Sequence, residues 1–119
     1  MAKYTAVIAG ATGAIGSALA RQLGPQDQWK VFGISRQQPT APVDGVTYIS
    51  MDMTQRQNCV EVLSEYPGIT HVFYCGRATH GEQMLESAED NLLLLDNLLH
   101  GVESSNHALE HVHLVQRVV

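Results

Sequence analysis

A glycine-rich turn between an apolar run and an amphipathic segment constrains the fold of this chain more than any other feature. Gly10, Gly13 and Gly16 follow the apolar run Tyr4–Ala9 and open a segment, residues 15–23, with apolar residues at helical spacing. In such a turn Gly10 makes the tight exit from the strand, Gly13 lets a pyrophosphate approach the backbone, and Gly16 lets the helix pack close to the sheet. The unpaired amides at the helix start can hold an anion. The sequence therefore predicts a dinucleotide-binding turn; a glycine-rich turn that only saves space is the alternative.

The rest of the chain alternates apolar runs with segments of helical period, which indicates βαβ units and a parallel sheet. After Tyr4–Ala9 we expect strands at residues 29–34, 46–51, 69–75 and 109–115. Thr54 and Gln57 form a capping box for a short helix that ends near Glu65, and the longest helix is expected at 82–102. The predicted fold class is α/β, a Rossmann-type doubly wound parallel sheet of five strands in the order 3-2-1-4-5.

The longest predicted helix carries a stripe of apolar residues that we expect to face the sheet. The members of that stripe are Leu85, Ala88, Leu92, Leu95 and Leu99. The leucine run at 92–95 is expected to be core under the sheet, with a partner surface as the alternative.

Length, charge and cysteine content limit the class of protein. The 119 residues suit one domain of the usual size, about 100–200 residues, and cannot hold a nucleotide domain together with a full substrate domain. The net charge of −5 argues against a nucleic-acid partner, and no apolar run approaches the roughly 20 residues that span a bilayer. Because the start of the chain lacks a hydrophobic signal core and Cys59 and Cys75 make no disulfide framework, we expect a reducing, cytoplasmic setting.

The end of the second predicted strand indicates which dinucleotide binds. NAD-selective sites place Asp or Glu there to bind the ribose hydroxyls, whereas this chain has Ser35 and Arg36. The guanidinium of Arg36 suits a 2′-phosphate, so the sequence predicts NADP (NADPH); a solvated surface arginine is the alternative. After the third strand, Asp52 can meet the adenine amino group while Met53 packs on the ring. Alternatively, Asp52 caps the helix beside Thr54.

These segments together resemble the short-chain dehydrogenase/reductase superfamily in its extended or atypical branch, and within it the progesterone 5β-reductase / iridoid synthase-like group. The resemblance covers nearly the whole chain and rests on residues 10–16, 29–36, 52–53, 71–76 and 91–99, with the Trp-Lys-Val-Phe-Gly string of the second strand as its most specific part. It implies that residues 1–119 are the N-terminal portion of an NAD(P)-binding Rossmann domain, incomplete relative to the family. The predicted cofactor-binding residues are Gly10, Thr12, Gly13, Ala14, Ile15, Gly16, Ser35, Arg36, Asp52, Met53, Cys75 and Gly76.

The chain departs from this group at three places. Gln37 stands where the group often has a second arginine, and Arg77 stands where it often has an aromatic residue. After the fifth strand the group continues into a second half that bears the catalytic tyrosine, whereas this chain ends at Val119. Reductases of the superfamily also place a lysine four residues after that tyrosine, where it lowers the tyrosine pKa.

No tyrosine–lysine pair of that kind is present, because Lys3 and Lys30 are the only lysines and neither follows a tyrosine at that spacing. We therefore expect no catalytic residue in this chain. The sequence favours an NADP-binding segment of an oxidoreductase that reduces a carbonyl or an activated alkene, inactive by itself. A non-catalytic NAD(P)-sensing or interaction module with the same fold is the alternative.

The remaining polar residues give weaker indications. His111 and His113 share one face of the fifth strand, but no cysteine or carboxylate motif accompanies them, so no metal is expected. In the complete enzyme the second partner is a small-molecule substrate. The oligomeric state stays open, including a homo-oligomer formed at the exposed edge of the fifth strand.

Overall fold

One parallel sheet forms the centre of the computed structural model, which describes residues 2–35, 39, 41–75, 88–105 and 108–114. Within these residues five strands lie in the order β3-β2-β1-β4-β5, and every neighbouring pair is parallel. The predicted fold class and strand order are therefore confirmed. The strands are β1 Tyr4–Ala9, β2 Trp29–Ser35, β3 Val46–Ser50, β4 His71–Tyr74 and β5 His111–Leu114.

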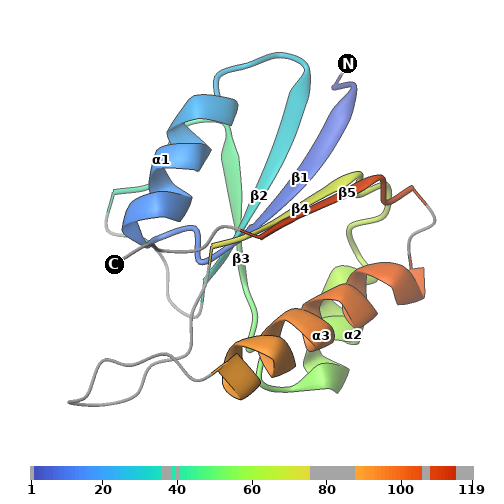
Figure 1. The fold of residues 1–119 in the computed structure, drawn as a ribbon. Coiled ribbons are helices and arrows are strands. Elements are labelled where there is room, and N and C mark those ends of the chain that lie inside the picture. Colours follow the sequence, from blue (N-terminus) through green and yellow to red (C-terminus); the bar gives the residue numbers. More distant parts are fainter. Residues whose placement is uncertain (1, 36–38, 40, 76–87, 106–107, 115–119) are drawn as a thin grey trace.

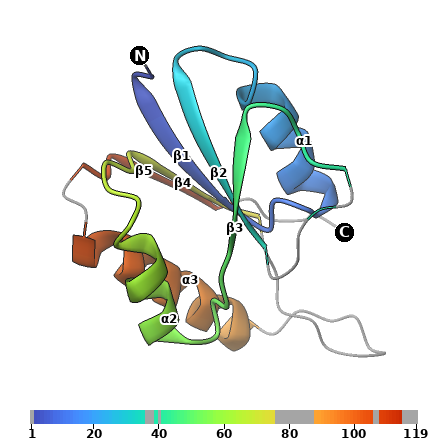
Figure 2. The ribbon, with the colours of Figure 1, turned by 180° about the vertical axis from the view of Figure 1, so that it is seen from behind.

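Helices cover both faces of the sheet. Helix α1, Ala14–Leu23, lies on one face, while α2, Arg56–Leu63, and α3, Ala88–Ser105, lie side by side on the other (Figure 1, and from behind in Figure 2). Right-handed crossovers between parallel strands produce this two-sided cover. Within the described residues, no helix is both long enough and apolar enough to cross a membrane.

The central strand β1 shows why its sequence is a continuous apolar run. Ala6 and Ile8 pack on the α1 side, whereas Val7 and Ala9 pack on the α2–α3 side, and all four are 0% exposed. A strand that is buried on both faces needs apolar residues at successive positions rather than at alternate ones. The turn that follows β1 therefore leaves the sheet between the α1 layer and the α2–α3 layer.

The predicted capping box at the start of α2 is wrong. The helix begins at Arg56, its N-cap is Gln55, and no side chain caps it. The hydroxyl of Thr54 donates instead to Oδ1 of Asp52 at 2.6 Å, and the backbone N–H of Thr54 donates to the same oxygen at 2.9 Å. Because these bonds close a local turn before the helix, the Thr54 hydroxyl is engaged outside α2. Asp52 thus shapes the approach to α2 and is not its N-cap.

The predicted apolar stripe on α3 is also partly wrong. Leu92 and Leu93 are 64% and 50% exposed, whereas Leu98 and Val102 are 0% exposed. The cause is the close approach of α3 to α2, since a Cβ added at Gly101 would lie 2.9 Å from the carbonyl carbon of Cys59. That approach turns the row through Leu98 and Val102 inward. Leu95 and Leu99 are half-buried against the core as expected, and Leu85 lies outside the described residues.

Candidate functional site

The turn between β1 and α1 has the form that the glycine pattern predicts. Gly10 has a φ of 78°, which is the left-handed region that glycine adopts without strain. The backbone N–H of Gly13 donates to the carbonyl of Gly10 at 3.1 Å, and α1 starts at the next residue. Residues 12–15 are exposed, and the first turn of α1 carries no acidic side chain. The positive end of the helix dipole therefore opens to solvent without a negative group of its own.

Gly13 and Gly16 differ in what would surround an added side chain. A Cβ at Gly16 would lie 2.0 Å from the carbonyl oxygen of Gly10, so internal packing alone requires glycine there. A Cβ at Gly13 would lie 3.5 Å from the same oxygen, which is an ordinary contact. Since Gly13 also has an unstrained φ of −75°, nothing within the described residues requires glycine at this position. Among the described residues, only the Gly10 carbonyl oxygen lies within 4 Å of a Cβ built at Gly13.

Backbone hydrogen bonds bring the ends of four strands to this turn. The N–H of Ala11 donates to the carbonyl of Ile34 at 3.3 Å, and the N–H of Cys75 donates to the carbonyl of Ala9 at 3.0 Å. The N–H of Met51 donates to the carbonyl of Ser35 at 3.3 Å. The sites predicted after β1, β2, β3 and β4 therefore share the carboxyl edge of the sheet, where ligands bind in open α/β folds.

Ten of the predicted site residues fall on this edge, and two cannot be placed. The glycine turn, Ser35, the Asp52–Met53 pair and Cys75 follow the strand ends as expected. Arg36 and Gly76 lie outside the described residues. The predicted cofactor-binding residues that the structure describes therefore lie at one edge of the sheet. That they bind a cofactor stays a prediction.

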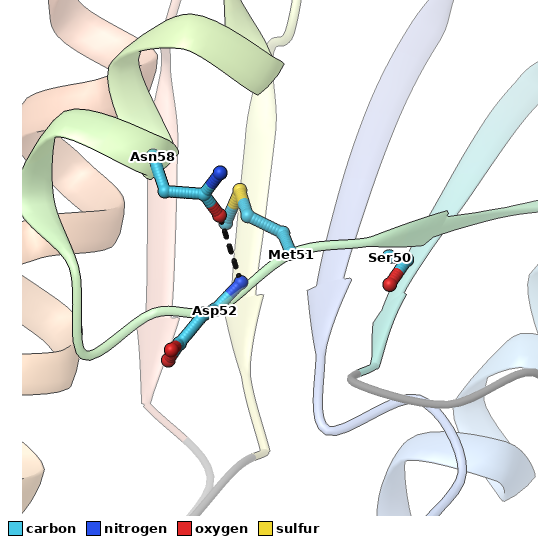
Figure 3. A pocket seen from close by; sticks show the side chains of 4 residues that line it. All are labelled: Ser50, Met51, Asp52 and Asn58. Atoms are coloured by element: carbon cyan, nitrogen blue, oxygen red, sulfur yellow. Dashed lines mark hydrogen bonds between the residues drawn. The ribbon is translucent and has the colours of Figure 1, made fainter.

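A hollow of about 380 Å³ lies beside the end of β3. Figure 3 shows the four residues that line it: Ser50, Met51, Asp52 and Asn58. The N–H of Asp52 donates to Oδ1 of Asn58 at 3.0 Å, and the carboxylate of Asp52 points away from Asn58 (Figure 3). Sequence reasoning missed Asn58; the available signal was an amide side chain in the short helix expected after the third strand.

The two cysteines are unsuited to nucleophilic chemistry. Both are free, and burial raises the pKa of the Cys75 thiol. Burial also raises the pKa of the Cys59 thiol, and the negative charge of Asp52 raises it further. Neutral thiols are poor nucleophiles, so burial leaves neither cysteine activated.

Three histidines, His71, His111 and His113, form a stack on the α1 side of the sheet, near the amino ends of the strands. The His71 ring lies 4.9 Å from that of His111 and 6.1 Å from that of His113, and His113 stacks on Phe73 at 4.7 Å. Burial and the neighbouring His111 lower the pKa of His71. Among the described residues no group of three histidine, cysteine or carboxylate side chains is arranged to hold a metal ion.

Both lysines lie away from the candidate site. Lys3 immediately precedes β1 and Lys30 is the second residue of β2, so they belong to the opposite, amino-terminal edge of the sheet. The Lys3 amine lies 5.3 Å from the centre of the Tyr4 ring, and that of Lys30 lies at the same distance from Phe32. Neither amine is at the edge where the glycine turn opens.

Comparison with known sequences gives one family over nearly the whole chain. The model of the NAD dependent epimerase/dehydratase family matches residues 6–115. The (S)-8-oxocitronellyl enol synthase of Catharanthus roseus is 32% identical over 118 residues, and the 3-oxo-Delta(4,5)-steroid 5-beta-reductase of Arabidopsis thaliana is 35% identical over 113 residues. These alignments cover 92% and 90% of this chain, yet only 29% of each relative.

Solved structures show the same fold at low sequence identity. A short chain dehydrogenase family protein from Francisella tularensis superposes with a TM-score of 0.70 at 17% identity, over 95% of this chain and 50% of its own. A short chain dehydrogenase from Burkholderia cenocepacia, solved in complex with NADP, superposes with a TM-score of 0.68 at 16% identity, over 88% of this chain and 50% of its own. The resemblance inferred from the sequence motifs is thus confirmed by independent comparison.

Proposed function

The chain belongs to the NAD dependent epimerase/dehydratase family, and from this premise we propose that it is the NADP-binding segment of a short-chain reductase. The dinucleotide lies across the carboxyl edge of the sheet. Its pyrophosphate meets the backbone at residues 12–16, and its adenine end meets Asp52 and Met53. When bound, NADPH supplies a hydride to a carbonyl or to an activated alkene. We also propose that residues 1–119 act as one dinucleotide-binding domain in a cytoplasmic setting.

The observation that carries this proposal is the unexplained glycine at position 13. Gly10 needs its positive φ and Gly16 needs its missing Cβ, so both are accounted for by the fold. Gly13 has neither requirement, and within the described residues a Cβ there would meet only the Gly10 carbonyl oxygen, at 3.5 Å, beside the helix start. A pyrophosphate that approaches the backbone at van der Waals distance supplies the missing reason.

The preference for NADPH over NADH rests on the end of β2. Ser35 closes the strand, and no acidic residue follows it before Asp44. A carboxylate at this place would repel a 2′-phosphate, whereas the guanidinium of Arg36 pairs with one. Arg36 is accordingly assigned to the 2′-phosphate, with Ser35 and Cys75 as neighbours of the cofactor.

The class of substrate is supported by the relatives. One of them is by name a 5-beta-reductase of a 3-oxo-Delta(4,5)-steroid, which is an alkene conjugated with a carbonyl. This chain spans 29% of the length of that relative, so the pocket for such a substrate is assigned to the whole reductase and not to these 119 residues.

A binding role without turnover is the second candidate. The position of Lys3 and Lys30 at the far edge favours it, because no described lysine can lower the pKa of a tyrosine beside the dinucleotide. Positioning of the hydride donor against its acceptor supplies a large part of the rate enhancement, and an open edge does not provide it. We therefore expect this chain to bind NADPH and to leave it unoxidised.

Titration of the purified 119-residue chain with NADPH and NADH, by calorimetry, tests the proposed binding. Saturable binding that is tighter for NADPH is expected, and Arg36→Ala should remove most of the preference, which corresponds to roughly 1–3 kcal/mol for a charge-assisted contact. Arg21→Ala on α1 is the matched control for loss of a positive charge. Equal affinity for both dinucleotides contradicts the NADP assignment, and failure to bind either one contradicts the site.

Assays with enones, aldehydes and ketones test whether the 119-residue chain oxidises NADPH by itself. Saturable NADPH oxidation that disappears in Gly13→Val would make this chain a complete enzyme. Binding without oxidation is the expected result.

A further inference from the structure

One buried polar side chain on α3 has both ends of its amide engaged at the loop between β3 and α2. Asn97 is 2% exposed, although it lies in a leucine-rich part of the helix. Its Nδ2 donates to the carbonyl oxygen of Met53 at 2.8 Å, and its Oδ1 accepts from Nε of Arg56 at 3.3 Å. A buried amide is stable only when its donors and acceptors are paired, so these bonds fix the orientation of Asn97.

Both partners of Asn97 belong to the same short stretch. Met53 lies between the end of β3 and the start of α2, where its carbonyl is outside any regular ladder, and Arg56 is the first residue of α2. The Arg56 guanidinium also pairs with Asp96, the residue before Asn97. Because those two side chains are 49% and 65% exposed, the ion pair contributes little by itself and mainly orients Arg56.

The same loop holds the residues assigned to the adenine ring. Asp52 is fixed on one side by Asn58 of α2, through a bond of 3.0 Å to its backbone N–H. Met53 is fixed by Asn97 of α3, a residue that is 44 positions away in the sequence. The loop is therefore fastened to both helices by two asparagine side chains, one on each side of the Asp52–Met53 pair.

We propose that Asn97 is a positioning residue for the adenine end of the dinucleotide, an inference that rests on the proposed function. By holding the Met53 carbonyl, it fixes the backbone from which the Asp52 carboxylate and the Met53 side chain project. One of these side chains must meet the flat face of the adenine ring and the other its amino group. Both therefore need a rigid backbone, because a displacement of about 1 Å already weakens such contacts. Asn97 itself touches no ligand in this proposal.

The test compares two nucleotides that differ only in the base. ADP and UDP share the ribose and the diphosphate, so the ratio of their affinities reports recognition of adenine and is insensitive to contacts at the glycine turn. In the unaltered chain we expect tighter binding of ADP. In Asn97→Ala the affinity ratio should fall by about tenfold, while the affinity for UDP stays nearly constant.

Val102→Ala is the matched control. Val102 lies on the same helix, is 0% exposed and belongs to the same core. Its apolar side chain cannot form a hydrogen bond with the loop. This variant lowers the stability of the fold through a cavity, and its ADP-to-UDP ratio should stay at the value of the unaltered chain. Amide hydrogen exchange at residues 52–55 should accelerate in Asn97→Ala relative to the rest of the chain, and should not do so selectively in Val102→Ala.

The outcomes are distinct. An ADP-to-UDP ratio that is unchanged in Asn97→Ala overturns the positioning role and leaves the proposed function intact. Failure of the unaltered chain to bind ADP overturns the proposed function and the positioning role together. If Asn97→Ala does not fold, Asn97→Asp replaces it: the carboxylate keeps an acceptor for Arg56 but loses the donor to Met53, and an unchanged ratio in that variant equally overturns the proposal.

Discussion

The glycine turn after β1 and the loop after β3 lie at the same edge of the sheet, but they are built in different ways. The turn is made by backbone: a positive φ at Gly10, a close approach at Gly16 and a hydrogen bond between residues three apart. The loop is made by side chains, since Asn58 and Asn97 reach it from two helices. The comparison shows that the glycine turn is encoded in seven consecutive residues, whereas the loop is held by side chains from two helices.

The largest expected effect concerns the glycine that the turn itself requires. In Gly16→Val the new Cβ would lie 2.0 Å from the Gly10 carbonyl oxygen, so the turn and the start of α1 must separate. We expect a loss of about 3 kcal/mol or more in the free energy of unfolding, measured by urea denaturation. Ala18→Val, at an exposed position of the same helix, is the control for introducing a β-branched residue. It should lower the free energy of unfolding by well under about 1 kcal/mol.

A second substitution separates ligand contact from folding within the same turn. Gly13→Val should leave α1 packed, because a Cβ at this position meets its nearest neighbour among the described residues at 3.5 Å. The branched side chain would occupy the space assigned to the pyrophosphate, so NADPH affinity should fall by about 100-fold or more while the free energy of unfolding changes by less than about 1 kcal/mol. Unchanged affinity in Gly13→Val would show that the turn is only a compact connection.

A third change tests the loop by removing its support from α2. Asn58→Ala removes the oxygen that receives the N–H of Asp52 at 3.0 Å. We expect a loss of about 1 kcal/mol in the free energy of unfolding and a rise of about threefold in the Kd of ADP, measured by calorimetry. The Kd of UDP should stay constant; equal losses for both nucleotides would mean that the loop and the turn are not separate units.

The smallest effect concerns pH and lies outside both regions. Burial, followed by the proximity of His111, lowers the pKa of His71, so the unfolded chain takes up a proton there more readily than the folded protein does. The free energy of unfolding should therefore fall as the pH drops through about 6.5, the ordinary histidine value. Urea denaturation at about pH 7.5 and about pH 5.5 measures the change, which should shrink in His71→Gln. The ADP-to-UDP affinity ratio should be similar at both pH values, because His71 lies at the amino end of β4.

Much of the fold and the geometry of the glycine turn could be predicted from the sequence. The strand order followed from apolar runs joined by crossovers, and the run Tyr4–Ala9 matched β1 because both faces of that strand are buried. The roles of Gly10 and Gly16 followed from their places between a strand and a helix. Both kinds of signal lie in consecutive residues, so local stereochemistry and periodicity are sufficient to interpret them.

Only the tertiary structure decided how the loop with Asp52 and Met53 is held. The face of α3 that is buried depends on how closely Gly101 approaches Cys59, and the start of α2 depends on the Asp52 oxygen that takes the Thr54 hydroxyl. The hydrogen bond from Asn97 to Met53 joins residues 44 positions apart. The helical spacing of apolar residues predicts one apolar stripe on a helix. It does not indicate which polar atom of another element will lie beside a given side chain of that helix. That information arises only when the helices pack, because a buried amide takes the orientation that pairs its donors and acceptors.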